Sequence, residues 1–184
     1  MLQNGIDMHD NGIIHRILIV YDEAARRIDE HASLDLAPIA RAASIVSSFV
    51  HDCHETLEEQ LVFPRLLVAH REAELSATLL RQHRRGRELT DAIIRSARTS
   101  ATFEMGHALR SFSRMYRPHA AHEDTVLFPA FRALVGRVGY RELSEQFKDE
   151  ERRLFGERDS ENALIEIVKI ETAFGLADLA EFTP

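Results

Sequence analysis

The chain has 184 residues, which suits one domain with a sizeable core or one domain with an appendage. Its 45% hydrophobic and 29% charged residues are ordinary for a globular protein. The net charge of −7 removes the electrostatic basis for binding nucleic acid, and the single cysteine, Cys53, excludes an internal disulfide framework.

Apolar residues at helical spacing predict four long helices, over residues 11–30, 38–69, 77–97 and 103–135. Residues 1–10 read as an irregular lead-in, and Pro64, Pro118 and Pro129 should kink the helices that contain them. No segment alternates convincingly enough to be a strand. We therefore expect an all-α protein whose residues 1–136 form an antiparallel up-down four-helix bundle.

The remaining residues, 137–184, predict a C-terminal helical extension. Two further helices are expected over roughly 140–155 and 161–173, with Gly156 and Gly175 as helix stops. Apolar side chains on this tail must be covered, so it should pack on the bundle or on a second copy in a homodimer.

No apolar run approaches the roughly 18 residues of a membrane span. The start of the chain also lacks the Lys or Arg of a secretion signal, since none occurs in residues 1–10. We expect a cytoplasmic protein with neither a membrane nor a nucleic acid as partner.

One motif occurs twice in the predicted bundle. His54 is followed by Glu58 and then by Phe63-Pro64, and the same order recurs 65 residues later as His119, Glu123 and Phe128-Pro129. Residues four apart share one face of a helix, about 6 Å apart, so each motif offers an imidazole and a carboxylate to one point.

The second and fourth helices lie diagonally across an up-down bundle and run parallel, so both motifs can point at one interior site. Counting residues back from the turns near 70 and 101 places His83 of the third helix at the same level. Mixed imidazole and carboxylate ligands suit iron or manganese, and two carboxylates that can bridge favour two ions over one. The alternative is a metal-free core, but several buried ionisable groups without an ion would be costly.

The repeated motif, together with His83 in the segment QHRRGREL, resembles the hemerythrin-like, HHE cation-binding domain. The ending IETAFGLADLAEFTP is similar to that of one bacterial branch of this family. The resemblance implies two iron ions in a non-haem centre, with manganese or zinc as alternatives, and a diatomic molecule or peroxide as the ligand. The metal ligands expected from the motifs are His54, Glu58, His83, His119 and Glu123.

The chain departs from the family pattern on the first helix, where Asn11 stands in place of an expected histidine. His15, one turn further on, is the preferred substitute, and His9 is the other candidate. Glu55 follows His54 directly, and an acid at this position adds a ligand in some relatives.

Three further positions near the motifs bear on the predicted site. Arg87 stands where the oxygen-carrying members have a second histidine. His122 fits a surface or outer position better than a ligand, and Tyr116 fits either a hydrogen bond to the site or simple interior packing.

Three functions are compatible with these residues. The first is a protein that binds or senses O2, NO, peroxide or iron, and the second is a di-iron oxidoreductase of the peroxidase or oxidase kind. The third is a metal-free helical protein that mediates interactions. The sequence has no recognisable nucleophile motif or Gly-rich cofactor loop, which favours binding over enzymatic catalysis.

Overall fold

A computed structural model describes residues 10–155, 159–178 and 180 of the chain. The predicted lead-in before Asp10 and the helix stop at Gly156 lie outside these residues. In the described part, every long element is helical and there is no strand, which confirms the all-α class. The α-helices are α1 (Asp10–Asp29), α2 (Leu36–Ile45), α3 (Phe63–Val68), α4 (Ala73–Thr99), α5 (Thr102–His122), α6 (Phe128–Phe155) and α7 (Asp159–Phe174). Three π-helical segments lie between them, η1 (Val46–Glu55), η2 (Glu58–Val62) and η3 (Glu123–Leu127).

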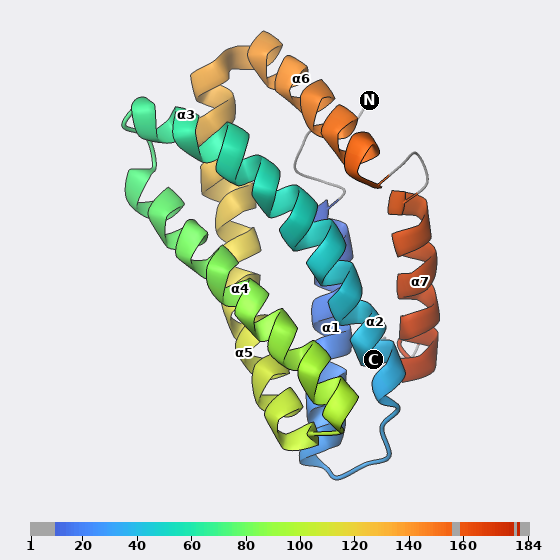
Figure 1. The fold of residues 1–184 in the computed structure, drawn as a ribbon. Coiled ribbons are helices and arrows are strands. Elements are labelled where there is room, and N and C mark those ends of the chain that lie inside the picture. The colour runs from blue at the N-terminus through green and yellow to red at the C-terminus, as the bar shows by residue number, and fades with distance from the viewer. Residues whose placement is uncertain (1–9, 156–158, 179, 181–184) are drawn as a thin grey trace.

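Four helical runs pack side by side as a bundle (Figure 1). α1 packs against α5, α5 against α4, α4 against α2, and α2 against α1. The predicted second helix is the unbroken run from α2 through α3, and the predicted fourth helix is α5, η3 and the start of α6. Because the runs that carry the two motifs occupy opposite corners of this arrangement, their inward faces meet across its interior.

The helices begin and end where local chemistry favours it. The N–H of Ala37 donates to the side chain of Asp35 at 2.9 Å, which caps the start of α2. Ser100, with φ 55°, ends α4 in the left-handed region and allows the tight turn into α5. These short turns place α4 directly beside α5.

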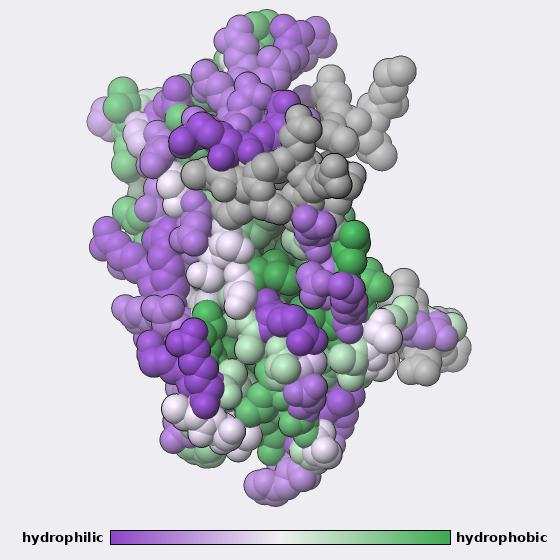
Figure 2. Space-filling model, turned by 45° about the vertical axis from the view of Figure 1, so that its right-hand side comes forward, coloured by the Kyte–Doolittle hydropathy of each residue, from purple (hydrophilic) through white to green (hydrophobic). Residues whose placement is uncertain are grey.

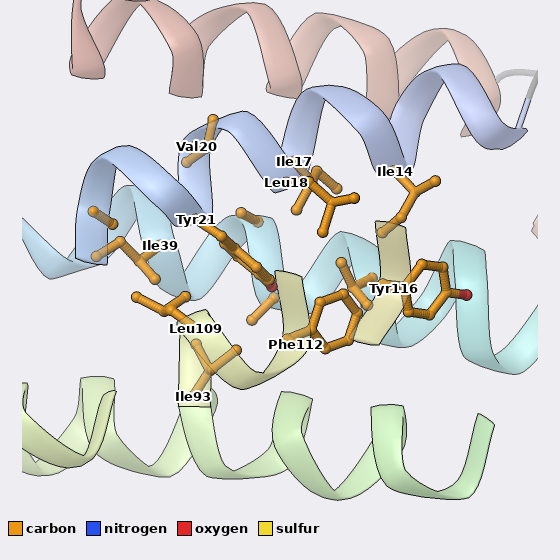
Figure 3. Close-up of a cluster of buried hydrophobic side chains, with 14 of the residues drawn as sticks. Ile14, Ile17, Leu18, Val20, Tyr21, Ile39, Ile93, Leu109, Phe112 and Tyr116 are labelled. Carbon is orange, nitrogen blue, oxygen red and sulfur yellow. The ribbon is translucent and has the colours of Figure 1, made fainter. Parts of the chain in front are cut away.

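Two apolar clusters fill the bundle. In the first, the ring of Phe112 lies edge-on to Tyr21 at 5.5 Å and stacks on Tyr116 at 4.9 Å between centroids (Figure 3). The second contains Phe63, Phe128 and other buried side chains at the α3 end. Burying each large side chain contributes roughly 1.5–3 kcal/mol, so the two clusters supply much of the driving force for folding.

A layer of buried polar side chains separates the two apolar clusters along the chain. On the second helical run, Val50 belongs to the first cluster and Leu57 to the second. On the fourth run, the corresponding pair is Tyr116 and Leu127. Between these pairs lie the buried polar residues His51, His54 and Glu55 on the second run, together with Cys53 of the second cluster, and His119 and Glu123 on the fourth run. Polar groups buried at this depth need partners, and they are the first place to look for a site.

The C-terminal helices pack on the outside of the bundle. α6 bends at Gly136, whose φ of 70° favours glycine, and α7 lies against α1 and α2. Ile167, Ile170 and Phe174 of α7 complete the first apolar cluster, and Arg16 of α1 pairs with Glu171 through two contacts of 2.7 and 2.5 Å. α7 ends before Gly175, as predicted, with φ 71° at the glycine.

Some apolar surface stays exposed on the outer side of α7, at Ile165 and Val168. Figure 2 shows hydrophobic surface interleaved with hydrophilic groups on one face of the molecule. The homodimer remains a prediction. Among the described helices, none is both long enough and apolar enough to cross a membrane.

Candidate metal centre

The two motifs bring their histidine and carboxylate together as the spacing predicts. Nε2 of His54 lies 3.3 Å from Oε1 of Glu58, and Nε2 of His119 lies 2.8 Å from Oε1 of Glu123. All four side chains are buried. Each motif therefore presents one imidazole and one carboxylate to the interior.

Both motifs run into a π turn immediately after the carboxylate. The N–H of Phe63 donates to the carbonyl of Glu58, and the N–H of Phe128 donates to the carbonyl of Glu123, each five residues earlier. The following prolines explain this, because proline lacks an N–H and its ring clashes with the carbonyl four residues before it. A π turn relieves that clash without ending the helix, and such turns are frequent at functional sites.

His83 of α4 completes a group of five side chains. Its Nε2 lies 3.5 Å from Oε2 of Glu58 and 3.8 Å from Oε1 of Glu123, so it contacts the carboxylates of both motifs. The level of His83, inferred from turn positions, thus agrees with the structure. Two sets of potential ligand atoms result, each within 4.8 Å of one another: His83, His119 and Glu123, and His54, Glu58 and Glu123. Glu123 is common to both sets.

Outer hydrogen bonds fix the orientation of two of these imidazoles. Nδ1 of His83 lies 3.0 Å from Oε1 of Glu59, and Nδ1 of His119 lies 2.9 Å from Oε1 of Gln82. Both oxygens are acceptors, so each Nδ1 donates a proton to its partner. In a neutral imidazole this leaves a lone pair on Nε2, directed at the carboxylates.

The converging atoms have no adequate partners among the protein groups described. Both oxygens of Glu58, Oε1 of Glu123, and Nε2 of His83 and of His119 make no hydrogen bond of acceptable geometry. This is so although Nε2 of His83 lies within 4 Å of both Glu58 and Glu123, and Nε2 of His119 lies 2.8 Å from Glu123. Burying several such atoms without compensation costs a few kcal/mol each. A cation among them would satisfy all five, and His and carboxylate ligands together suit iron, manganese or zinc.

The pKa values of three side chains in the centre are also shifted from their ordinary values. Burial, together with the charge of Glu123, raises the pKa of Glu58. Burial also opposes ionisation of Glu123, but His119 and His83 outweigh it and hold its pKa low. Burial opposes a charge on His83 too, yet the carboxylates of Glu123 and Glu59 beside its two nitrogens raise its pKa to about 10. In the metal-free protein, His83 therefore carries protons on both ring nitrogens, and a positive charge, at neutral pH.

Glu55, one of the further candidate ligands, is fully buried but engaged in a different set of contacts. The hydroxyl of Tyr116 donates to its Oε1 at 3.0 Å, and Nδ1 of His51 lies 3.0 Å from the same oxygen. Its other oxygen lies 3.1 Å from Nη2 of Arg87. Tyr116 is thus held by Glu55 rather than directed at the five converging ligands.

The first helix does not bring its candidate histidine to the centre. His15 is exposed on α1, because Ile14, Ile17 and Leu18 occupy the face that packs into the bundle. His9 and the side chain of Asn11 lie outside the described residues. His122 is also exposed, and its Nδ1 lies 2.6 Å from the carbonyl of Pro118, which fits the surface position expected for it.

Glu59 and Gln82, which orient the imidazoles of His83 and His119, are not part of the predicted ligand set. Glu59 had a signal in the sequence, since it pairs with Asp124 when the two motifs are aligned. Gln82 had none, because its role depends on how α4 lies against α5. The sequence therefore predicts the converging inner side chains better than the groups that orient them.

A buried His and carboxylate site inside a helical bundle defines the class as a cation-binding helical protein. The chain matches the hemerythrin HHE cation-binding domain over residues 6–131, and again over residues 74–173. It belongs to that family. The two matches begin 68 residues apart (74 − 6), close to the 65 residues that separate the motifs (119 − 54).

The chain is similar to three mycobacterial proteins that are described as uncharacterized. The protein Mb2018 of Mycobacterium bovis, and the proteins MT2051 and Rv1995 of Mycobacterium tuberculosis, are each 36% identical over 183 residues. Each match covers 96% of this chain and 72% of the relative. No solved structure matches the chain.

Gln82→Ala is expected to weaken metal binding about 10- to 100-fold, because it removes the hydrogen bond that orients His119. The metal dissociation constant, measured by competition with a chelator, would show this. Arg81→Ala is the matched control, since Arg81 is exposed and its Nη2 donates to Thr78 of the same helix. Equal affinity in Gln82→Ala and Arg81→Ala would contradict an orienting role for Gln82.

Proposed function

We propose that this protein is a non-haem di-iron protein that binds or senses O2, NO, peroxide or iron. The main support for two ions is that Glu123 belongs to both inner sets of potential ligand atoms. A carboxylate shared in this way can bridge two ions, and a site for one ion would need only one of the sets. The family's cation-binding description supports the same reading.

The chain's own residues have distinct roles in this proposal. His83 and His119 would hold one ion, His54 and Glu58 would hold the other, and Glu123 could contribute to both. When bound, iron supplies an exchangeable coordination position at which a small ligand can bind. The two carboxylates contribute negative charge inside an apolar core, which strengthens the attraction for a cation.

Iron content tests the proposal directly. Protein produced in iron-supplemented cells is expected to contain about two irons per chain by elemental analysis, with near-ultraviolet bands of an oxo-bridged pair. A chain with all five inner ligands replaced by Ala is the control for adventitious iron. Protein that retains no metal, or zinc alone, would contradict the proposal.

A further inference from the structure

Beside the two inner sets, the structure contains a third set of potential ligand atoms, which shares His83 with one of them. Glu55, Glu59 and His83 also each offer an atom within 4.8 Å of the others. This outer set differs from the inner ones because the side chain of Glu59 is partly exposed, at 28%. It therefore connects the buried layer with solvent.

The guanidinium of Arg87 occupies the outer set. Its Nη2 lies 2.9 Å from Oε1 of Glu59, 3.1 Å from Oε2 of Glu55 and 3.5 Å from the carbonyl of His51. One nitrogen thus faces three oxygens from the second helical run, while the arginine itself belongs to α4. Three oxygens around one positive atom are the arrangement that a small hard cation also favours.

The buried carboxylate of Glu55 needs the positive charge of Arg87 as compensation. Its side chain is completely buried, and both Tyr116 and His51 approach only Oε1. Its Oε2 completes no hydrogen bond among the described residues and has Arg87 as its nearby cation. A buried carboxylate without a compensating cation is strongly destabilised, so removal of Arg87 creates a demand for another positive charge.

We propose that Arg87 is a built-in cation that fills an additional metal site and thereby restricts the chain to the ions of the inner centre. Without it, Glu55, Glu59 and the carbonyl of His51 would bind a hard divalent cation such as Mn2+, because all three offer oxygen ligands. The 34% exposure of the Arg87 side chain gives an aqueous ion access to this position.

Counting Mn2+ in variant proteins tests the inference. Wild type and the Arg87→Met and Arg87→Gln variants are first loaded with iron and then titrated with Mn2+, whose free form is followed by electron paramagnetic resonance. Both variants are expected to bind about one more Mn2+ per chain than wild type. Arg87→Lys should match wild type, because it keeps the positive charge.

Two controls isolate the outer set. Arg85→Met removes an exposed arginine of the same helix, which pairs with Glu88 at the surface, and should leave the count unchanged. Adding Glu59→Gln to Arg87→Met should abolish the extra ion. If a variant that retains the wild-type helical circular dichroism binds no additional Mn2+, the inference is overturned.

The inference rests on the proposed function only in assuming that the five inner side chains already hold metal ions. The wild-type iron content tests that function, whereas the difference between wild type and Arg87 variants tests the role of Arg87. A wild type without iron and an Arg87→Met variant that gains Mn2+ would overturn the first and support the second.

Discussion

Glu123→Ala is expected to leave the chain with little bound metal, the largest effect of any single ligand change. Glu123 belongs to both inner ligand sets, so its loss removes a donor from both positions at once. Loss of an outer hydrogen-bond partner already costs about 10- to 100-fold in affinity, and loss of a shared ligand should cost more. Metal content after gel filtration, compared with that of wild type prepared in parallel, is the measurement.

Two further variants make this test specific. Glu58→Ala should also lose most of the metal, because it removes the carboxylate that faces His54 and His83. His122→Ala changes an exposed histidine on the same helical run as Glu123 and should retain the metal. If His122→Ala alone abolished binding, the assignment of Glu123 as a ligand would be wrong.

Mild acidification is expected to release the metal, because binding must displace protons. His83 has a pKa of about 10 in the metal-free protein, so at neutral pH an ion competes with its proton. Each proton displaced lowers the apparent affinity roughly tenfold for every pH unit below that pKa. The raised pKa of Glu58 acts in the same direction. Dialysis at neutral and mildly acidic pH, followed by metal analysis, measures the loss.

The metal-free protein provides the control for this pH dependence, because its stability should move the opposite way. The pKa of His83 is raised from 6.5 to about 10, so its contribution to folding is complete below pH 6.5 and is lost as the pH rises through 10. Metal-free protein should therefore unfold at lower temperature under alkaline conditions. An alkaline loss that persists unchanged in His83→Gln would show that another group is responsible.

The sequence predicted which inner side chains converge, because their positions follow from helical periodicity. Residues four apart share a helix face whatever the details of packing, which brought His54 to Glu58 and His119 to Glu123. His83 could be placed by counting along antiparallel neighbours, since the turns in this protein are short. All three inferences need only the geometry of a regular helix.

Helical periodicity could not predict the contacts of Glu55 with other helices or the exposure of His15, because these depend on how neighbouring helices pack. Glu55 lies one residue after His54. Its contact with His51, four residues earlier, follows from helical spacing, but its contacts with Tyr116 of α5 and Arg87 of α4 do not. The exposure of His15 likewise depends on which side of α1 the bundle covers. Neither outcome follows from spacing within one helix.

The π turn after Glu58 determines more than the course of the backbone. It closes with one residue more than an α-helical turn, and one residue corresponds to about 100° of rotation around the helix. The extra residue therefore resets the phase of everything that follows, including the ring of Phe63, which stacks on His83 at 5.5 Å between centroids. Through this turn, Pro64 couples the position of the Glu58 carboxylate to that of the Phe63 ring, which packs against the imidazole of His83. A substitution of Pro64 would therefore change the packing around His83, which lies on a different helix, α4.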